Sequence, residues 1–155
     1  MKKMIGAIAV FMITYALFSA AGYLFPVDQE WYNSLKKPDW TPSGSAIGII
    51  WAILFALISL SAAIIYAAFS FKGAKSFWFA LLINYVLNQA FSYFQFTQKN
   101  LLAASIDCLL VAITAIVLLI IAKKYSRAPS YLLLPYFLWS AFATFLSFAI
   151  DSMNL

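Results

Sequence analysis

The sequence contains no histidine and only one cysteine, Cys108, among its 155 residues. A single chain therefore cannot form a disulfide, and the residue sets that usually bind zinc or haem iron are missing. The sequence also lacks a glycine-rich phosphate loop, a Ser/His/Asp set and paired carboxylates. These absences exclude conventional hydrolases, ATPases and metalloenzymes, so we expect no metal site and no required cofactor.

Charge is scarce as well, since charged residues make up 10% of the chain and hydrophobic residues 65%. A soluble globule of this size would need more polar surface, so the sequence predicts an integral membrane protein. Its apolar runs are continuous rather than alternating, which excludes a β-barrel and favours transmembrane helices. We expect a single all-α domain, residues 1–155, with membrane-length spans at about 4–25, 45–71, 76–98, 100–122 and 130–150.

The few charges are divided between alternate loops. Seven of the ten basic residues fall at the N-terminus and in the loops after the second and fourth spans, which a five-span topology places on one side. The positive-inside rule then predicts a cytoplasmic N-terminus, with the first loop and the C-terminus outside a plasma membrane. We expect the first span to be retained rather than cleaved as a signal peptide. The lysines form no dense run, so we expect no nucleic-acid partner.

The loop at residues 26–44 is the most informative segment, because it is long and places Trp31, Tyr32 and Trp40 among prolines. Aromatic rings carry a large apolar surface on few rotatable bonds, and proline fixes the backbone. This composition favours an ordered segment that faces a ligand over a flexible connector.

The second span places Ile47, Trp51 and Phe55 at four-residue spacing, so the three share one helical face. That face begins beneath the first loop, although ordinary packing or lipid contact would give the same pattern. Gly44 and Gly48 form a small-residue pair, and a homodimer is left open on this basis.

The third span is the most polar, with Asn84, Asn88, Phe91 and Gln95 on one stripe. Amides inside a bilayer need partners. They either bond to neighbouring helices or line a wetter cavity that accepts a polar ligand, and their spacing does not separate these alternatives.

The last two spans carry further candidates. Asp107 lies within an apolar run, and an intramembrane carboxylate is a functional candidate by default, although water or Lys99 could satisfy it from the nearby membrane boundary. In the fifth span, Trp139 begins a broad face of small and polar residues that would approach another helix closely or border a cavity.

Rare residues recur in a fixed register along the chain: Trp31-Tyr32, Leu35, Lys37-Pro38, Trp40, Pro42, Gly48, Trp51, Asn84-Tyr85, Asn88-Gln89 and Leu138-Trp139-Ser140. Together with the five spans and the long first loop, they resemble the tryptophan-rich sensory protein and translocator protein family, also called peripheral benzodiazepine receptors. The resemblance covers nearly the whole chain. One departure is Ser43, which follows Pro42 where the family often has a second proline.

The resemblance implies a loop-covered pocket inside the bundle that binds porphyrins, haem-like tetrapyrroles, and benzodiazepine or isoquinoline carboxamide drugs. Bacterial members are linked to tetrapyrrole sensing, transport or light-dependent breakdown of protoporphyrin, for which Trp51 and Trp139 are the candidate reactive residues. Carried over residue by residue, the ligand-binding set is Trp31, Tyr32, Pro42, Ile47, Trp51, Phe55, Asn84, Asn88, Phe91, Gln95, Cys108, Trp139 and Ala143.

These features favour a membrane receptor in a bacterial plasma membrane, with porphyrin as ligand or, under photo-oxidation, as substrate. The alternative is a transporter or sensor-regulator of porphyrins or other small hydrophobic molecules. Neither an inverted repeat nor an ion-coupling pair supports active transport.

Overall fold

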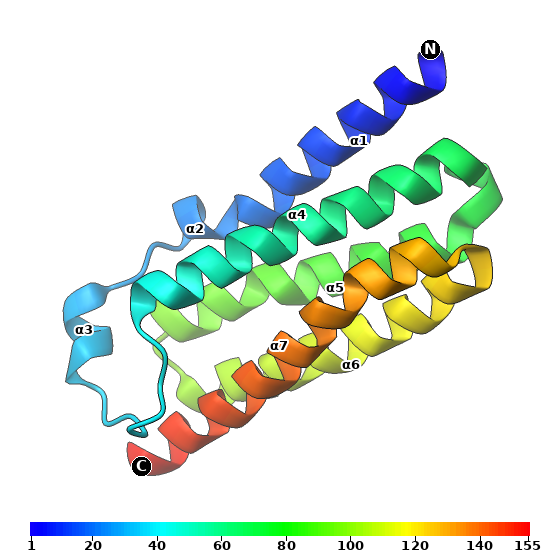
Figure 1. Ribbon diagram of the computed structural model, residues 1–155. Helices are drawn as coiled ribbons and strands as arrows, with labels where there is room; N and C mark the ends of the chain where they lie inside the picture. The colour runs from blue at the N-terminus through cyan, green and yellow to red at the C-terminus, as the bar shows by residue number, and fades with distance from the viewer.

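The computed structural model describes all residues, 1–155, and contains helices and loops but no strand (Figure 1). Its long helices pack side by side, which confirms the predicted all-α membrane bundle with an ordered first loop. The elements are α1 (Lys2–Ser19), α2 (Ala21–Leu24), α3 (Gln29–Ser34), α4 (Gly44–Phe69), the 3₁₀ turn η1 (Lys72–Ala74), α5 (Lys75–Ser92), the π-helical turn η2 (Tyr93–Thr97), α6 (Leu101–Tyr125) and α7 (Arg127–Met153).

Four segments are long and apolar enough to cross a membrane: Lys2–Leu24, Gly44–Phe69, Leu101–Tyr125 and Arg127–Met153. The helix α5 is not among them, because its amide side chains lower its hydropathy. Its Asn84 is fully buried, whereas Phe79, Leu82 and Val86 are 67%, 58% and 56% exposed. Because α5 runs along the bundle (Figure 1) and exposes these apolar side chains, we treat α5 and η2 as the fifth spanning segment.

Side-chain caps fix where two of the long helices begin. The Ser43 hydroxyl accepts a hydrogen bond from the Ala46 N–H at 3.2 Å, and the Asn100 side chain accepts one from the Ala103 N–H at 3.0 Å. Such caps satisfy N–H groups that the first turn of a helix leaves unpaired. Ser43, which departs from the family pattern, therefore has a local role as the N-cap of α4.

Small side chains let the helices approach closely in the interior. Ala62 of α4 and Ala115 of α6 have no exposed surface. A Cβ atom at Gly6 would lie only 2.6 Å from Cε1 of Tyr66, which is too close for any side chain while Tyr66 keeps this position. The close contact between α1 and α4 at this point therefore requires glycine at position 6. Lipid tails are as apolar as leucine, so close packing and hydrogen bonds between helices stabilise the bundle rather than burial from water.

The two ends of the bundle differ in charge. Hydrogen bonds between Lys99 and Asp28 and between Lys36 and Asn154 place the first loop, the turn before α6 and the C-terminus at one end. The N-terminus lies at the opposite end (Figure 1), and this end carries the other seven basic residues: two at the N-terminus and five around the connections from α4 to α5 and from α6 to α7. The structure thus separates the charges as the loop pattern predicts. That the basic end faces the cytoplasm stays a prediction.

Candidate functional site

The first half of the long loop is held against the end of α5. The rings of Trp31 and Tyr32 meet the ring of Phe96 edge-on, with centroids 6.5 Å and 6.4 Å apart. The Lys37 ammonium lies 4.6 Å from the centroid of the Tyr32 ring, and the Lys99 ammonium 5.6 Å from that of Trp31. These contacts place Trp31 and Tyr32, both members of the predicted ligand-binding set, over η2.

An ion pair and a helix cap reinforce this attachment. The Asp28 carboxylate accepts a hydrogen bond from the Trp31 N–H at 3.1 Å and pairs with the Lys99 ammonium at 2.8 Å. The hydrogen bond from Lys99 holds the pKa of Asp28 below its usual range, while burial raises the pKa of Tyr32. Because Lys99 is engaged with Asp28, it does not satisfy Asp107, which was one of the alternatives for that carboxylate.

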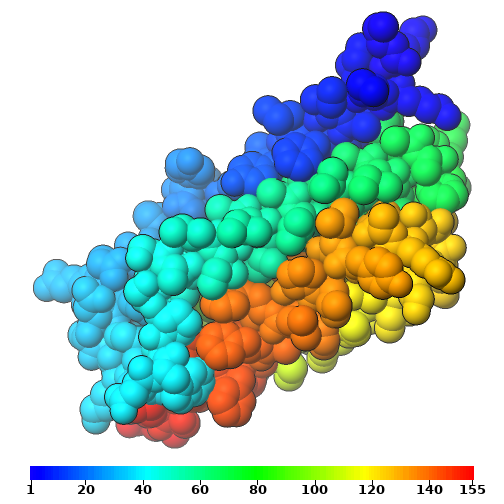
Figure 2. Space-filling model, in the orientation of Figure 1, coloured from blue at the N-terminus to red at the C-terminus, as the bar shows by residue number.

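The second half of the loop is held against α7. The Trp40 ring stacks on Phe145, at 5.6 Å and 27°, and meets Phe142 edge-on at 5.8 Å. The Asn154 side chain accepts a hydrogen bond from the Lys36 N–H at 3.0 Å and donates one to the Lys36 carbonyl at 2.8 Å. Figure 2 shows this part of the loop lying directly on the C-terminal residues. The loop therefore bridges the ends of α5 and α7.

Beneath the loop, aromatic rings form a continuous line that we call the aromatic row: Phe55, Trp51, Trp139, Phe142 and Trp40. Successive centroid distances are 5.6, 6.5, 5.3 and 5.8 Å. The contact between Trp51 and Phe55 agrees with the helical face that their spacing predicts. The row joins α4 to α7 and ends under the loop, so it brings together Trp51 and Trp139, two of the three tryptophans in the predicted set.

The amides of α5 form a hydrogen-bonded network with the neighbouring helices. Asn84 donates to the Val111 carbonyl at 3.2 Å and to the Thr114 hydroxyl at 2.8 Å. Its side-chain oxygen accepts from the Tyr136 hydroxyl at 2.7 Å, and Asn88 donates to that same hydroxyl at 3.1 Å. Both N–H groups of Asn84 are thus used within the protein, whereas one N–H of Asn88 is unused.

The network extends to the first span through Gln89. This side chain donates to Asn88 at 3.2 Å and to the Phe18 carbonyl at 2.9 Å, and accepts from the Ala21 N–H at 2.8 Å. Phe18 and Ala21 flank the junction of α1 and α2, where the helical hydrogen bonding is interrupted. Gln89 therefore supplies partners to backbone groups that would otherwise be unpaired in the membrane.

Four buried polar atoms have no hydrogen-bond partner within the protein: Gln95 Oε1, Asp107 Oδ2, Trp139 Nε1 and Ser140 Oγ. Leaving a buried donor or acceptor unpaired costs about 1–3 kcal/mol. Gln95 and Trp139 belong to the predicted ligand-binding set. Unpaired groups of this kind are where a bound molecule with complementary polar atoms would gain most.

Cys108 lies at the interface of α6 and α7, beside one of these unpaired groups. Its sulfur accepts a hydrogen bond from the Thr144 hydroxyl at 3.5 Å and lies 4.0 Å from the Ser140 carbonyl oxygen. The remaining members of the predicted set are half-buried: Pro42 before α4, Ile47 in its first turns, Phe91 near the end of α5 and Ala143 one turn after Trp139.

Three residues outside the predicted ligand-binding set are central to this arrangement: Trp40, Gln89 and Tyr136. Trp40 and Gln89 were part of the family pattern but had no role assigned. Tyr136 could have been found by spacing, because it precedes Trp139 and Ser140 by three and four residues and so shares their helical face.

Two surface hollows lie away from these residues. One, of about 190 Å³, lies between α1 and α4, and the other, of about 210 Å³, between α1 and α5. None of the predicted ligand-binding residues lines either hollow. In this conformation the rings of the aromatic row pack on one another, so a ligand between α4 and α7 would have to displace some of them.

Comparison with known proteins gives one consistent result. The model of the TspO/MBR family matches residues 7–153. The chain is 93% identical to the Bacillus subtilis (strain 168) membrane protein YtaB over the whole of both chains. It is 57% identical to the tryptophan-rich protein TspO of Bacillus cereus over 99% of each, and 26% identical to the human translocator protein over 78% of this chain and 73% of that one.

Proposed function

Because the chain belongs to the TspO/MBR family of membrane proteins, we propose that it is a receptor for planar tetrapyrroles such as protoporphyrin IX. Benzodiazepine and isoquinoline carboxamide compounds would occupy the same site, between α4, α5 and α7 beneath the loop. The observation that carries this proposal is the perpendicular pair of Trp51 and Trp139, at 6.5 Å and 85°, with the buried Trp139 N–H unpaired.

The aromatic row would supply most of the affinity. A tetrapyrrole presents a large flat face, and each aromatic pair adds about 0.5–1.5 kcal/mol beyond the burial of its area. An edge-to-face pair such as Trp51 and Trp139 can accept a flat ligand if one ring rotates. Contacts between the ligand and each indole ring then replace the contact between the two indoles. The cost of opening the row is thereby partly offset.

Polar groups around the row would orient the ligand. Trp139 Nε1 and the unused N–H of Asn88 are donors for ligand carbonyl or carboxylate oxygens. The unpaired oxygens of Gln95, in η2, and Asp107, in α6, would be the acceptors for N–H groups of a ligand large enough to reach these elements. The proposed site thus combines ring faces with both kinds of hydrogen-bonding group, as ligand sites generally do.

Titration of the reconstituted protein with protoporphyrin IX tests this proposal, with quenching of tryptophan fluorescence as the signal. We expect saturable quenching, and Trp139→Phe should weaken binding about fivefold, the equivalent of one net hydrogen bond of about 1 kcal/mol. The matched control is Trp78→Phe, which removes an indole at the opposite end of the bundle. Absence of saturable quenching in the wild type would refute the binding claim.

The same pair of tryptophans favours a second candidate function, light-dependent breakdown of bound protoporphyrin. The photoexcited porphyrin would take an electron from one indole and pass it to dioxygen, the oxidant consumed in breaking down the porphyrin ring, and the second indole in contact would return an electron to the first. We expect Trp51→Phe to retain porphyrin binding but to slow the loss of porphyrin absorbance under illumination. Equal decay in wild type and variant would leave only passive photobleaching.

The charge distribution predicts how the protein is oriented in the membrane. The basic end of the bundle would face the cytoplasm of a bacterial cell, and the loop would cover the site on the outer face of the plasma membrane. Labelling of a cysteine introduced at Ser34 by a membrane-impermeant thiol reagent in intact cells tests this orientation. A cysteine introduced at Ser126 is the control, and it should react only after the cells are lysed.

A further inference from the structure

We propose that the basic end of the bundle binds an anionic phospholipid. Its phosphate would occupy a pocket between α1 and α4, and one acyl chain would lie in the groove between α1 and α5. This site is at the other end of the molecule from the loop and the aromatic row, and it does not depend on what those elements bind.

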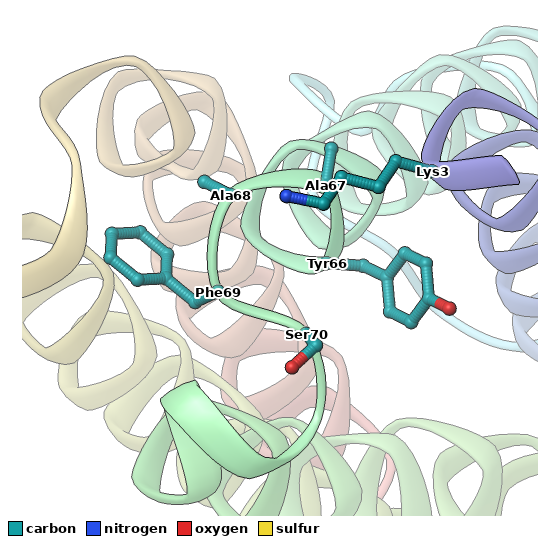
Figure 3. A pocket seen from close by; sticks show the side chains of 6 residues that line it. All are labelled: Lys3, Tyr66, Ala67, Ala68, Phe69 and Ser70. Atoms are coloured by element: carbon teal, nitrogen blue, oxygen red, sulfur yellow. The ribbon is translucent and has the colours of Figure 1, made fainter. Parts of the chain in front are cut away.

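The pocket offers the groups that a phosphate needs. The Lys3 side chain reaches from α1 across the last turn of α4, from which the hydroxyl groups of Tyr66 and Ser70 project (Figure 3). Neither hydroxyl hydrogen-bonds within the protein, so both can donate to an anion. An ammonium with two hydroxyls is a suitable donor set for phosphate oxygens. The pocket holds about 190 Å³ and is lined by Lys3, Tyr66, Ala67, Ala68, Phe69 and Ser70.

The positive charge around this pocket has no counterpart in the protein. The single salt bridge of the structure joins Lys99 to Asp28, at the opposite end. The four lysines in the first turn of α1 and around η1, namely Lys2, Lys3, Lys72 and Lys75, therefore have no acidic partner. Basic pockets between membrane helices on one side of a protein are typical binding sites for anionic headgroups.

The groove between α1 and α5 has the depth of one lipid leaflet. From Lys75, at the start of α5, to Tyr85 is roughly 15 Å along the helix axis, which is about half the hydrocarbon thickness of a bilayer. At this depth an apolar groove on the outer surface of the bundle faces hydrocarbon. It holds about 210 Å³ and is lined by Thr14, Leu17, Phe18, Trp78, Leu81, Leu82 and Tyr85.

Aromatic contacts join the pocket to the groove. The Phe71 ring lies 4.9 Å from the ring of Tyr66, in the pocket, and 4.9 Å from that of Trp78, in the groove. Trp78 Nε1 also donates a hydrogen bond to the carbonyl of Ser70 at 3.2 Å. Phe71 and the hydrogen bond from Trp78 therefore connect one hollow to the other, and tryptophan and tyrosine stand at the level where such residues usually meet lipid headgroups.

The positions of the pocket and the groove along the membrane normal indicate which molecule fits both. A cationic, hydroxyl-lined pocket lies at the membrane surface and an apolar groove lies below it, which matches the phosphate and acyl chain of a phospholipid. A second copy of this chain would bring its own lysines to the same level, and the like charges would repel.

Quenching by brominated lipids in phosphatidylcholine bilayers tests the proposal. The signal is the fluorescence that Trp78→Phe removes, because the other four tryptophans lie in or beneath the first loop or in α7. We expect brominated phosphatidylglycerol to quench this signal at a mole fraction at least threefold lower than brominated phosphatidylcholine does. Lys3→Gln should abolish that preference, and Lys124→Gln, at the same end but outside the pocket, should keep it.

Three results would overturn the proposal. Equal quenching of the wild type by the two brominated lipids would mean that the groove does not select a headgroup. Equal loss of the preference for phosphatidylglycerol in Lys3→Gln and Lys124→Gln would mean that the preference arises from the net positive charge of this end and not from the pocket. Loss of the preference on addition of millimolar inorganic phosphate would mean that the pocket holds a free anion rather than a lipid. Circular dichroism would establish that each variant is folded.

Discussion

Replacing Tyr136 with phenylalanine removes one hydroxyl group from the centre of the bundle, and we expect it to destabilise the protein by about 1–3 kcal/mol. This hydroxyl donates to Asn84 at 2.7 Å and accepts from Asn88 at 3.1 Å. Tyr136 and Asn84 are both fully buried. The substitution keeps the phenyl ring, and therefore keeps the contact with Trp51 at 6.3 Å.

The expected magnitude follows from the groups left without partners. A hydrogen bond between membrane helices contributes about 0.6 kcal/mol on average and up to about 1.7 kcal/mol. Two such bonds are lost, and the Asn84 oxygen is left without a donor in a site that water does not reach. An unpaired buried acceptor costs about 1–3 kcal/mol, so the larger values apply if Asn84 cannot turn toward another donor.

Thermal unfolding in detergent, followed by circular dichroism, measures this effect. For a chain of this length, Tm falls by about 2–4 °C for each kcal/mol lost. Tyr131→Phe is the matched control, because it removes a hydroxyl from a 63% exposed tyrosine on the same helix. If both variants melt at the same temperature, the hydroxyl of Tyr136 does not stabilise the bundle and the reasoning from the network is refuted.

Three further predictions concern the ties of the loop and of the first span. Asn154→Ala removes both hydrogen bonds to Lys36, so we expect faster amide hydrogen exchange at residues 36–41 while exchange in α6 stays unchanged. The pKa of Asp28 is lower in the folded protein than the ordinary carboxyl pKa of about 3.9. Pairing of Asp28 with Lys99 therefore stabilises the loop fully at pH values above about 3.9, and this stabilisation is lost as the pH falls through the lower pKa of the folded state. Asp28→Asn, which keeps a capping side chain, should give the loop amides equal protection factors above and below that range once intrinsic exchange is corrected for. A pH dependence of the protection factors that persists in this variant would refute this assignment. Gln89→Ala leaves the backbone at the junction of α1 and α2 without partners, so it should lower Tm by several degrees, and a Tm equal to that of Gln98→Ala would contradict this.

The sequence predicts the helical architecture well because lipid imposes strong constraints on it. Apolar runs of membrane length must form helices, and the charged residues, with the exception of Asp107 in α6, lie at or beyond the helix ends. The spacing of Trp51 and Phe55 correctly predicts a shared face, since helix geometry alone brings their rings together. The alternation of loops between the two sides of a five-span chain also correctly predicts that the seven basic residues and the long first loop lie at opposite ends of the bundle.

Contacts between helices were less predictable, because they depend on the rotation and relative height of each helix. The amide stripe of α5 allowed either partners on neighbouring helices or a ligand cavity, and for Asn84 the structure selects the neighbours. The composition of the loop predicts that Trp31 and Tyr32 are ordered but not what they pack against, and the structure places both rings against Phe96. No local pattern specifies that contact, which joins segments about sixty residues apart in the sequence.

Tyr136 links the amide network, to which it belongs, with the aromatic row, which it contacts and which is the proposed ligand site. Substituting Asn84 or Tyr136 should therefore disturb the packing of α5, α6 and α7 together with the position of Trp51. Asn88 and Trp139 differ, since each keeps an N–H group that no protein atom uses. Under the proposed function a ligand would use these two N–H groups. Asn88 also hydrogen-bonds to Tyr136 and Gln89, so a substitution at Trp139 would alter ligand preference at the lower cost to the bundle.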